Sequence, residues 1–266
     1  NKNFPMRNPK CNHDNFMRSF EGPKEQSEKI YYIVKKSIID LGLVFFGGYA
    51  SKLYSKFMPR NLRQKLSLKN PDFDVLALNP ERAAIIIKER LEMENIKDVK
   101  IKKQKNIGEI ISDHYEITIK NDTVAFIYKP LACHSFNKIY IKGREVKVAT
   151  IDTMLSFYLA FLFANRSYYD HDRIYCMSQY LYLVQSKNRL AQKGVLKRFS
   201  LNCVGDQITL ESMRNEKSKK FEELKGKRGT KEYEDWFLKY SPSQKKTLKK
   251  KTLKKKTLKK KKTKKN

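Results

Sequence analysis

A glycine pair directly after a short apolar run is the feature that most constrains the fold of this chain. The apolar run covers residues 43–46, the pair is Gly47 and Gly48, and residues 49–57 follow with a helical pattern. Two glycines let the backbone turn sharply and pass close to a neighbouring group, because no Cβ atom stands in the way. The pattern predicts a buried strand, a tight turn and a helix whose first backbone N–H groups and positive dipole end face the turn.

A second apolar run, residues 71–76, carries two carboxylates. Asp72 and Asp74 are two positions apart, so a strand projects both from one side while Phe73 and Val75 pack against the other face. Carboxylates held this close repel each other unless a cation lies between them, and Mg²⁺ or Mn²⁺ takes carboxylate and phosphate oxygens. The order of the motifs indicates metal-assisted chemistry on a nucleotide. Taken singly, each motif also has a plainer interpretation, namely a tight turn or a chance loop.

These motifs resemble the catalytic subunits of the poly(A) polymerases of large cytoplasmic DNA viruses, which belong to the polymerase-beta-like nucleotidyltransferase superfamily. The resemblance covers about residues 29–190, and the segments that carry it are 47–50 (GGYA), 72–75 (DFDV), 79–80 (NP) and 124–130 (VAFIYKP). It implies an α/β (α+β) nucleotidyltransferase fold, with a mixed sheet backed by helices. The implied activity is that of a polynucleotide adenylyltransferase, which adds AMP from ATP to RNA 3′ ends in mRNA polyadenylation.

The resemblance also assigns roles to residues of this chain. Asp72 and Asp74 are the expected catalytic residues and the expected ligands of Mg²⁺ or Mn²⁺. The expected contacts of the triphosphate are Gly47, Gly48 and Ser51, with Lys129 or Arg144 to neutralise its charge. The expected partners are ATP, an RNA 3′ end, and either a second copy of the chain or a second polymerase subunit. The implied location is the cytoplasm of a virus-infected host cell, or the virion.

Phe126 departs from the family pattern. In the family this strand usually reads Val-Ala-Asp-Ile, and its Asp is the third catalytic carboxylate. A general base typically contributes 10² to 10⁴-fold, roughly 3 to 5.5 kcal/mol of the barrier. The departure therefore predicts either a weak enzyme or a catalytically degenerate nucleotidyltransferase-like subunit that binds RNA. Glu116 and Asp122 are candidate substitutes, although an exposed strand carboxylate and a turn residue are their plainer interpretations.

The net charge of +30 predicts a polyanionic partner. Residues 245–266 contain 14 Lys and no acidic residue, and subtracting them leaves +16 on the first 244 residues. A third alternative is a nucleotidyltransferase that acts on another acceptor, such as a tRNA or an antibiotic, and the basic body favours RNA over a small cationic drug. In the Lys-rich segment a leucine recurs every five residues. On a helix this spacing would not place the leucines on one face, so we interpret the segment as a disordered tail.

The chain is expected to comprise an N-terminal arm (1–24), a nucleotidyltransferase domain (25–165), a helical, basic C-terminal region (166–240) and the Lys-rich tail (241–266). A basic surface insertion is expected at 58–65. Helices are predicted over 25–41, from 80, from 151 and over 172–191. Strands are predicted over 43–46, 71–76, 99–102, 110–118, 123–128, 138–141 and 146–148.

The four cysteines are widely spaced and never form Cys-x-x-Cys, which predicts free thiols and argues against a disulfide framework or a structural zinc. The longest apolar stretch, residues 154–163, is too short to cross a bilayer, and no signal peptide is visible. We therefore expect no membrane partner.

Overall fold

The computed structural model describes residues 11, 24–58, 71–107, 110–166, 169–207 and 209–237. Most of the expected N-terminal arm, nearly all of the expected insertion and the whole Lys-rich tail lie outside these residues. The chain divides into two compact units, residues 1–217 and 218–266. The domain boundary expected after residue 165 stays a prediction.

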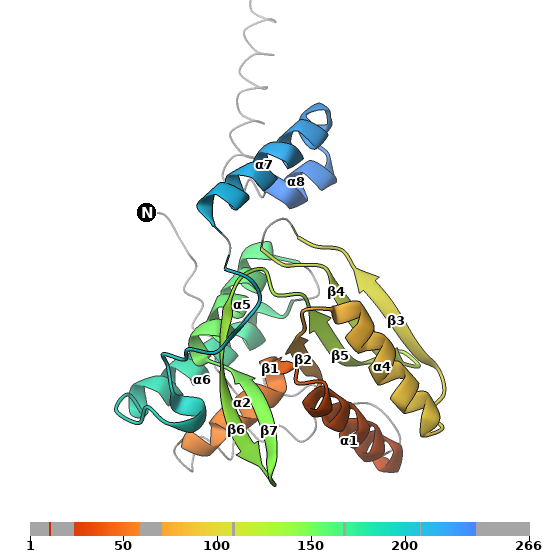
Figure 1. Cartoon of the computed structure of the whole chain (residues 1–266), viewed down its shortest axis with the longest axis vertical. Helices are drawn as coiled ribbons and strands as arrows, with labels where there is room; N and C mark the ends of the chain where they lie inside the picture. Colours follow the sequence, from red (N-terminus) through yellow and green to blue (C-terminus); the bar gives the residue numbers. More distant parts are fainter. Residues whose placement is uncertain are drawn as a thin grey trace, which may run out of the picture. The chain divides into compact units, whose positions relative to one another are not determined.

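The described chain begins with helices and strands in alternation, continues with five consecutive strands, β3 to β7, and is mostly helical after them (Figure 1). The strands are β1 (Val44–Phe46), β2 (Phe73–Leu76), β3 (Val99–Gln104), β4 (His114–Ile119), β5 (Asp122–Tyr128), β6 (His134–Ile141), β7 (Arg144–Ala149) and β8 (Cys203–Val204). The helices are α1 (Lys24–Asp40), α2 (Gly47–Tyr54), α4 (Pro80–Met93), α5 (Ile151–Ala164), α6 (His171–Lys187), α7 (Leu210–Leu224) and α8 (Lys231–Phe237).

The strands form one mixed sheet in the order β3-β4-β5-β2-β1-β7-β6-β8. Strand β2 pairs with β1 in the antiparallel sense and with β5 in the parallel sense. The expected mixed sheet backed by helices is confirmed. Strand β2 lies in the interior of the sheet, between β5 and β1. The two carboxylates, in β2 and directly before it, are therefore near the middle of the sheet.

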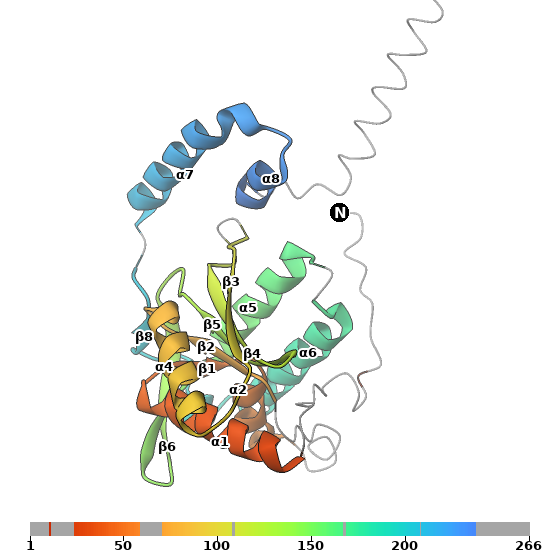
Figure 2. The ribbon, with the colours of Figure 1, turned by 90° about the vertical axis from the view of Figure 1, so that its right-hand side faces the viewer.

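Helices cover both faces of the sheet (Figure 2). On one face, α1 packs beside α4, and the ring of Tyr31 in α1 lies 4.8 Å from that of Phe73 in β2. On the other face, α5 packs beside α6, and the ring of Phe157 in α5 lies 4.7 Å from that of Phe46 in β1. Because Phe73 faces α1, the two-residue repeat of β2 turns Asp74 toward the α5 and α6 side.

Polar side chains at the helix starts fix where these helices begin. Asn79 accepts a hydrogen bond from the Arg82 backbone N–H at 3.0 Å, directly before Pro80, the first residue of α4. Asp170 accepts one from the Arg173 N–H at 3.0 Å and starts α6. The cap therefore places Arg173 in the first turn of that helix.

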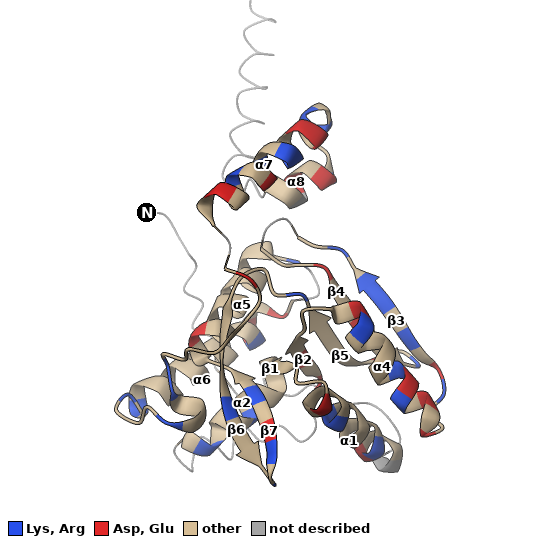
Figure 3. Cartoon of the chain, in the orientation of Figure 1, with Lys and Arg blue, Asp and Glu red and all other residues tan. Residues whose placement is uncertain are grey.

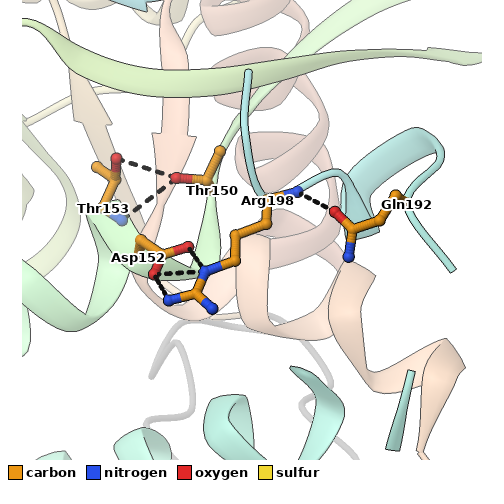
Figure 4. Close-up of polar contacts among 5 residues, drawn as sticks. All are labelled: Thr150, Asp152, Thr153, Gln192 and Arg198. Atoms are coloured by element: carbon orange, nitrogen blue, oxygen red, sulfur yellow. Dashed lines mark hydrogen bonds and ion pairs between the residues drawn. The ribbon is translucent and has the colours of Figure 1, made fainter. Parts of the chain in front are cut away.

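The segment after α6 returns to the start of α5 (Figure 4). Thr150 caps α5 by accepting a hydrogen bond from the Thr153 N–H at 3.3 Å. Arg198 donates from Nε and Nη2 to the carboxylate of Asp152 in the first turn of α5, and its backbone N–H donates to Gln192. A fork-shaped contact of this kind fixes orientation as well as charge, so it holds residues 192–198 against the domain.

Beyond Lys217, the C-terminal part of α7, a 3₁₀ turn (Lys225–Lys227) and α8 make a small helical pair. Its centre is aromatic: the Phe237 ring lies 4.7 Å from Tyr233 and 6.2 Å from Phe221. This unit agrees with the expected helical character of the C-terminal region.

Some expected elements differ from those observed. Helix α2 begins at Gly47 instead of residue 49 and ends at Tyr54, with a 3₁₀ turn (Ser55–Phe57) after it. Strand β4 begins at His114 instead of residue 110, and before it Ile111 pairs with Ile107 in an isolated antiparallel bridge. Strand β8 is too short, at two residues, to show a pattern in the sequence.

The prediction of free thiols is wrong. Disulfide bonds join Cys11 to Cys176 and Cys133 to Cys203, and the Cα atoms are 5.5 Å and 5.3 Å apart. The partners are 165 and 70 positions apart, so sequence spacing could not reveal them. Cys203 meets Cys133 because β8 pairs with the first residues of β6. No described helix has the length and apolar composition needed to cross a membrane.

Candidate active site

A cavity of about 410 Å³ lies between the sheet and helices α5 and α6. The sheet contributes residues from β2, β3, β4 and β5, the start of α2 contributes the glycine pair, and α5 and α6 close the opposite side. The lining residues used below are Gly47, Gly48, Asp72, Asp74, Gln104, His114, Glu116, Thr123, Phe126, Tyr128, Tyr158, Asp170 and Arg173. The volume falls in the range of small-molecule sites.

Both carboxylates of the Asp-x-Asp strand line this cavity. Asp74 lies within β2 and Asp72 directly precedes it, and each is partly exposed while Phe73 between them is buried. The alternation that the sequence predicts is therefore present. The cavity brings together four of the expected site residues: Gly47, Gly48, Asp72 and Asp74.

Gly47 is required by its contact with Asp74. Its φ is +58°, a left-handed conformation that side chains other than glycine rarely adopt. A Cβ atom at this position would lie 2.6 Å from Cγ of Asp74, and one at Gly48 would lie 2.8 Å from Cβ of Pro71. The glycine pair therefore lets the start of α2 lie directly against the carboxylate strand.

Phe126 occupies the place in the sheet beside Asp74. Strands β2 and β5 run parallel with Asp74 opposite Phe126, and β4 continues the row with Glu116 opposite Phe126. The Phe126 side chain is only partly buried and lines the cavity. As expected from the sequence, β5 lies beside the strand that carries Asp74, and the position opposite Asp74 presents an apolar ring to the cavity.

Glu116 also lines the cavity, one strand farther out. Thr123 Oγ1 donates to its Oε1 at 2.6 Å, and Gln104 Nε2 donates to its Oε2 at 2.9 Å. Asp122, the other candidate substitute, is not among the lining residues. Two hydrogen bonds from neutral donors fix the Glu116 carboxylate in one position without neutralising it.

An aromatic cluster backs this end of the cavity. The ring of His114 stacks on Tyr128 at 4.5 Å and lies 6.1 Å from Phe126. Burial lowers the pKa of His114 below its ordinary value, although a hydrogen bond to the Ser112 carbonyl works in the other direction. At neutral pH the imidazole is therefore uncharged, with Nδ1–H donating to Ser112.

Helix α6 brings a cation to the cavity that sequence reasoning missed. Arg173 is the one Lys or Arg among the described residues that line it. Arg173, Asp72 and Asp74 all lie close enough to act on the Tyr158 hydroxyl. Burial raises the pKa of Tyr158, and the negative charge of Asp74 raises it further, so its hydroxyl stays protonated and can donate. The sequence signal for Arg173 was the helix cap three residues before it.

The other residues expected to contact a triphosphate lie elsewhere. Ser51 is 1% exposed and does not line the cavity, and its hydroxyl lies next to that of Tyr158. Lys129 does not line the cavity either. Arg144 binds Asp40 at 3.4 Å in an ion pair at the turn end of β7. Their contact with a triphosphate stays a prediction.

The two carboxylates fit a Mg²⁺ or Mn²⁺ ion that shares its ligands with a substrate. Among the described residues, no group of three or more His, Cys, Asp and Glu side chains is placed to hold a metal. Mg²⁺ in proteins is usually bound through one or two carboxylates, substrate phosphates and water, not in an all-protein cage. Asp72 and Asp74 supply hard oxygen donors of that kind on a cavity wall open to a phosphate.

Comparison with known proteins agrees with this geometry. No protein-family model matches the chain, and no curated protein matches its sequence. The Megavirus polyadenylate synthase structure matches with a TM-score of 0.58 at 14% identity, over 81% of this chain and 46% of that one. The fold is therefore nucleotidyltransferase-like.

Two smaller proteins match more loosely. The antibiotic-resistance factor ANT(2'')-Ia has a TM-score of 0.34 at 11% identity, over 63% of this chain and 93% of that one. An antigenic nucleotidyltransferase-like protein from Paracoccidioides brasiliensis has a TM-score of 0.30 at 14% identity, over 68% and 95%. This chain spans less than half of the Megavirus protein, 46% of its length.

Proposed function

We propose that this protein is a nucleotidyltransferase that adds AMP from ATP to RNA 3′ ends. The observation that carries the proposal is that Asp72 and Asp74 face a cavity of about 410 Å³ directly beside the glycine turn at the start of α2. The Megavirus match supports adenylate transfer to RNA as the version to test first. The family resemblance further suggests a viral enzyme that acts in the cytoplasm of the infected cell.

In this proposal the triphosphate lies at the start of α2. Backbone N–H groups at Gly47 and Gly48 and the positive end of the helix dipole favour negative charge there. Arg173 binds a phosphate oxygen from the α6 side, and the protonated Tyr158 hydroxyl donates to another. A Mg²⁺ or Mn²⁺ ion held by Asp72 and Asp74 would supply Lewis-acid polarisation of the α-phosphate.

The reaction itself is an in-line displacement. The 3′-oxygen of the RNA forms a bond to the α-phosphorus while the bond from that phosphorus to the β-phosphate oxygen breaks, and pyrophosphate leaves. The hydroxyl proton passes to solvent water, because Phe126 has no acceptor to offer. This chain contributes positioning of the two reactants and charge stabilisation at the phosphate.

Phe126 favours a second candidate, an RNA-binding subunit that does not catalyse. Its ring stands opposite Asp74, where the family resemblance expects the third carboxylate. In this case the cavity binds nucleotide or RNA without turnover. Two partly exposed carboxylates on one cavity wall argue for the enzyme, since their mutual repulsion has no structural benefit.

The test is incorporation of radiolabelled AMP into an oligo(A) primer by the full chain, with Mg²⁺ and separately with Mn²⁺. We expect primer extension that EDTA abolishes. If the protein still binds ATP or the primer but incorporates no AMP with either ion, the second candidate, an RNA-binding subunit that does not catalyse, is the better assignment.

A further inference from the structure

The cavity continues past Asp74 on the side away from the glycine turn. Paired positions on four neighbouring strands form one row, which is Asp74 on β2, Phe126 on β5, Glu116 on β4 and Lys102 on β3. Paired residues project from the same face of a sheet, and neighbouring strands lie about 4.8 Å apart. The row therefore extends about 14 Å from the carboxylates to the end strand of the sheet.

The charge along this row changes from negative to positive. Lys102 is exposed, and Lys100, two positions earlier, projects from the same face of β3. Figure 3 shows the basic residues of β3 along that edge of the sheet. A row that begins at a nucleotide-binding cavity and ends at lysines suits a ligand with a polar sugar near the cavity and a phosphate farther out.

Glu116 has hydrogen-bonding capacity left for a ligand. Each of its oxygens accepts one hydrogen bond, from Thr123 and from Gln104, and a carboxylate offers about four acceptor sites. The fixed carboxylate lines the cavity, so a remaining site can accept a hydrogen bond from a ligand hydroxyl. The 2′-hydroxyl of a ribose is such a donor, and a DNA terminus lacks it.

Phe126 supplies a flat apolar surface next to that carboxylate. The ring is partly exposed to the cavity, and the rings of His114 and Tyr128 lie beside it on the same face, 6.1 Å and 6.2 Å away. The neutral imidazole and the two rings carry no charge that would repel or attract a base. An aromatic face of this kind stacks any base, without selecting its identity.

We propose that Phe126, Glu116 and Lys102 bind the 3′-terminal nucleotide of the RNA acceptor. The base stacks on Phe126, the ribose 2′-hydroxyl donates to Glu116 while the 3′-hydroxyl faces Asp74, and a backbone phosphate lies against Lys102. This inference rests on the proposed function, because it takes the acceptor to be RNA and places the triphosphate on the glycine side of Asp74. It gives Phe126 a role in holding the acceptor in place of the metal-ligand role that the family resemblance implies.

The test measures binding of labelled oligo(A) to the full chain by fluorescence anisotropy, without ATP or metal. One oligo ends in an ordinary ribose and the other in a 2′-deoxyribose. We expect the wild type to bind the ribose end about tenfold more tightly, as for charge-assisted hydrogen bonds. Glu116→Gln should abolish this preference, and Thr123→Val, which removes one support of Glu116, should reduce it.

Lys102→Ala should weaken both oligos equally and flatten the salt dependence by roughly 0.7 in the slope of log K against log salt. Two matched controls should behave as the wild type. Glu145→Gln changes a partly exposed strand carboxylate on β7 that pairs with Lys138. Lys103→Ala removes a lysine from the opposite face of β3, where it lies over Tyr115. Thermal melts check that every variant folds.

A wild type that binds both oligos equally would overturn the inference, and so would a Glu116→Gln variant that loses ATP binding but keeps the ribose preference. These outcomes are separate from those of the primer-extension test. A ribose preference without any AMP incorporation would contradict the proposed enzyme activity and support this acceptor site. AMP incorporation without a ribose preference would support the enzyme activity and contradict this acceptor site.

Discussion

At the scale of single residues, the candidate site depends on which side of a strand each side chain faces. Asp72 and Asp74 reach the cavity because β2 is extended and Phe73 between them packs on α1. Phe126 reaches the same cavity because β5 runs parallel to β2 in a register that places it opposite Asp74. A one-residue slip of either strand would turn these side chains into the core on the other face.

The first prediction concerns the carboxylates. Asp74→Asn should reduce metal-dependent AMP incorporation at least about 100-fold, because the amide keeps the shape of the side chain but is a poor ligand for a hard cation. Asp122→Asn is the matched control, since it makes the same change on β5 outside the cavity. Equal activity of the two variants in primer extension would show that Asp74 has no part in the reaction.

The second prediction concerns Phe126. Phe126→Asp should raise AMP incorporation at saturating primer at least tenfold, about 1.4 kcal/mol in the barrier, because it adds a third carboxylate beside Asp74. The loss of the ring should at the same time weaken primer binding. The partial exposure of this position lets the new charge be solvated from the cavity. Phe126→Asn is the control for size and polarity without charge. A variant that melts like the wild type and gains no activity over Phe126→Asn would contradict the prediction.

At the scale of elements, the junction of β1, the glycine pair and α2 positions the site. The start of α2 lies against Asp74 only because Gly47 has no side chain and adopts a positive φ. Helix α6 closes the other side, and its cap at Asp170 places Arg173 in the cavity. These two helices therefore bring backbone N–H groups and a guanidinium to the cavity that the carboxylates line.

The third prediction compares two glycines with positive φ. Gly47→Ala and Gly143→Ala should each lower the free energy of unfolding by about 1–2 kcal/mol, the cost of a left-handed alanine. Gly143 has φ +75° and open space around it, whereas a Cβ on Gly47 would push the Asp74 side chain away. Only Gly47→Ala should therefore lose most ATP binding and AMP incorporation. Chemical denaturation and isothermal titration measure the two effects.

If Gly47→Ala kept full ATP affinity while Gly143→Ala lost as much stability, the glycine would serve the turn alone. The position of Asp74 would then not depend on the close approach of α2. The comparison is informative because both substitutions add the same atom in the same region of backbone conformation.

Some features of these elements could be predicted from the sequence, and others could not. Strand β2 with its carboxylates, the helix after Gly48 and the register of Phe126 follow from local alternation and from glycine chemistry, and all were predicted. Arg173 and the Glu116–Gln104 contact were not, because they depend on how α6 and β3 pack on distant segments. The cysteine pairs were not predicted for the same reason, because the separation of two residues in the sequence does not show whether they lie close together in the folded sheet.

At the scale of the whole molecule, charge extends beyond the site. The first 244 residues carry +16 after the 14 lysines of residues 245–266 are subtracted from the total of +30. Part of this charge lies on β3, next to the proposed acceptor row (Figure 3). Under the proposed function, the basic body and the basic C-terminal segment both contribute to RNA binding, and they differ in how many phosphates each neutralises.

The last prediction separates the two contributions. Removal of residues 245–266 should weaken binding of a long oligo(A) and flatten its salt dependence, because each phosphate neutralised contributes roughly −0.7 to the slope of log K against log salt for single strands. The matched control keeps the 14 lysines of this segment in shuffled order, and it should bind like the wild type because the effect depends on charge and not on sequence. The ribose preference of the short oligos should survive the truncation, since the residues that produce it lie on β3, β4 and β5. An unchanged slope would mean that the Lys-rich segment does not touch RNA, and that the basic body alone holds the acceptor.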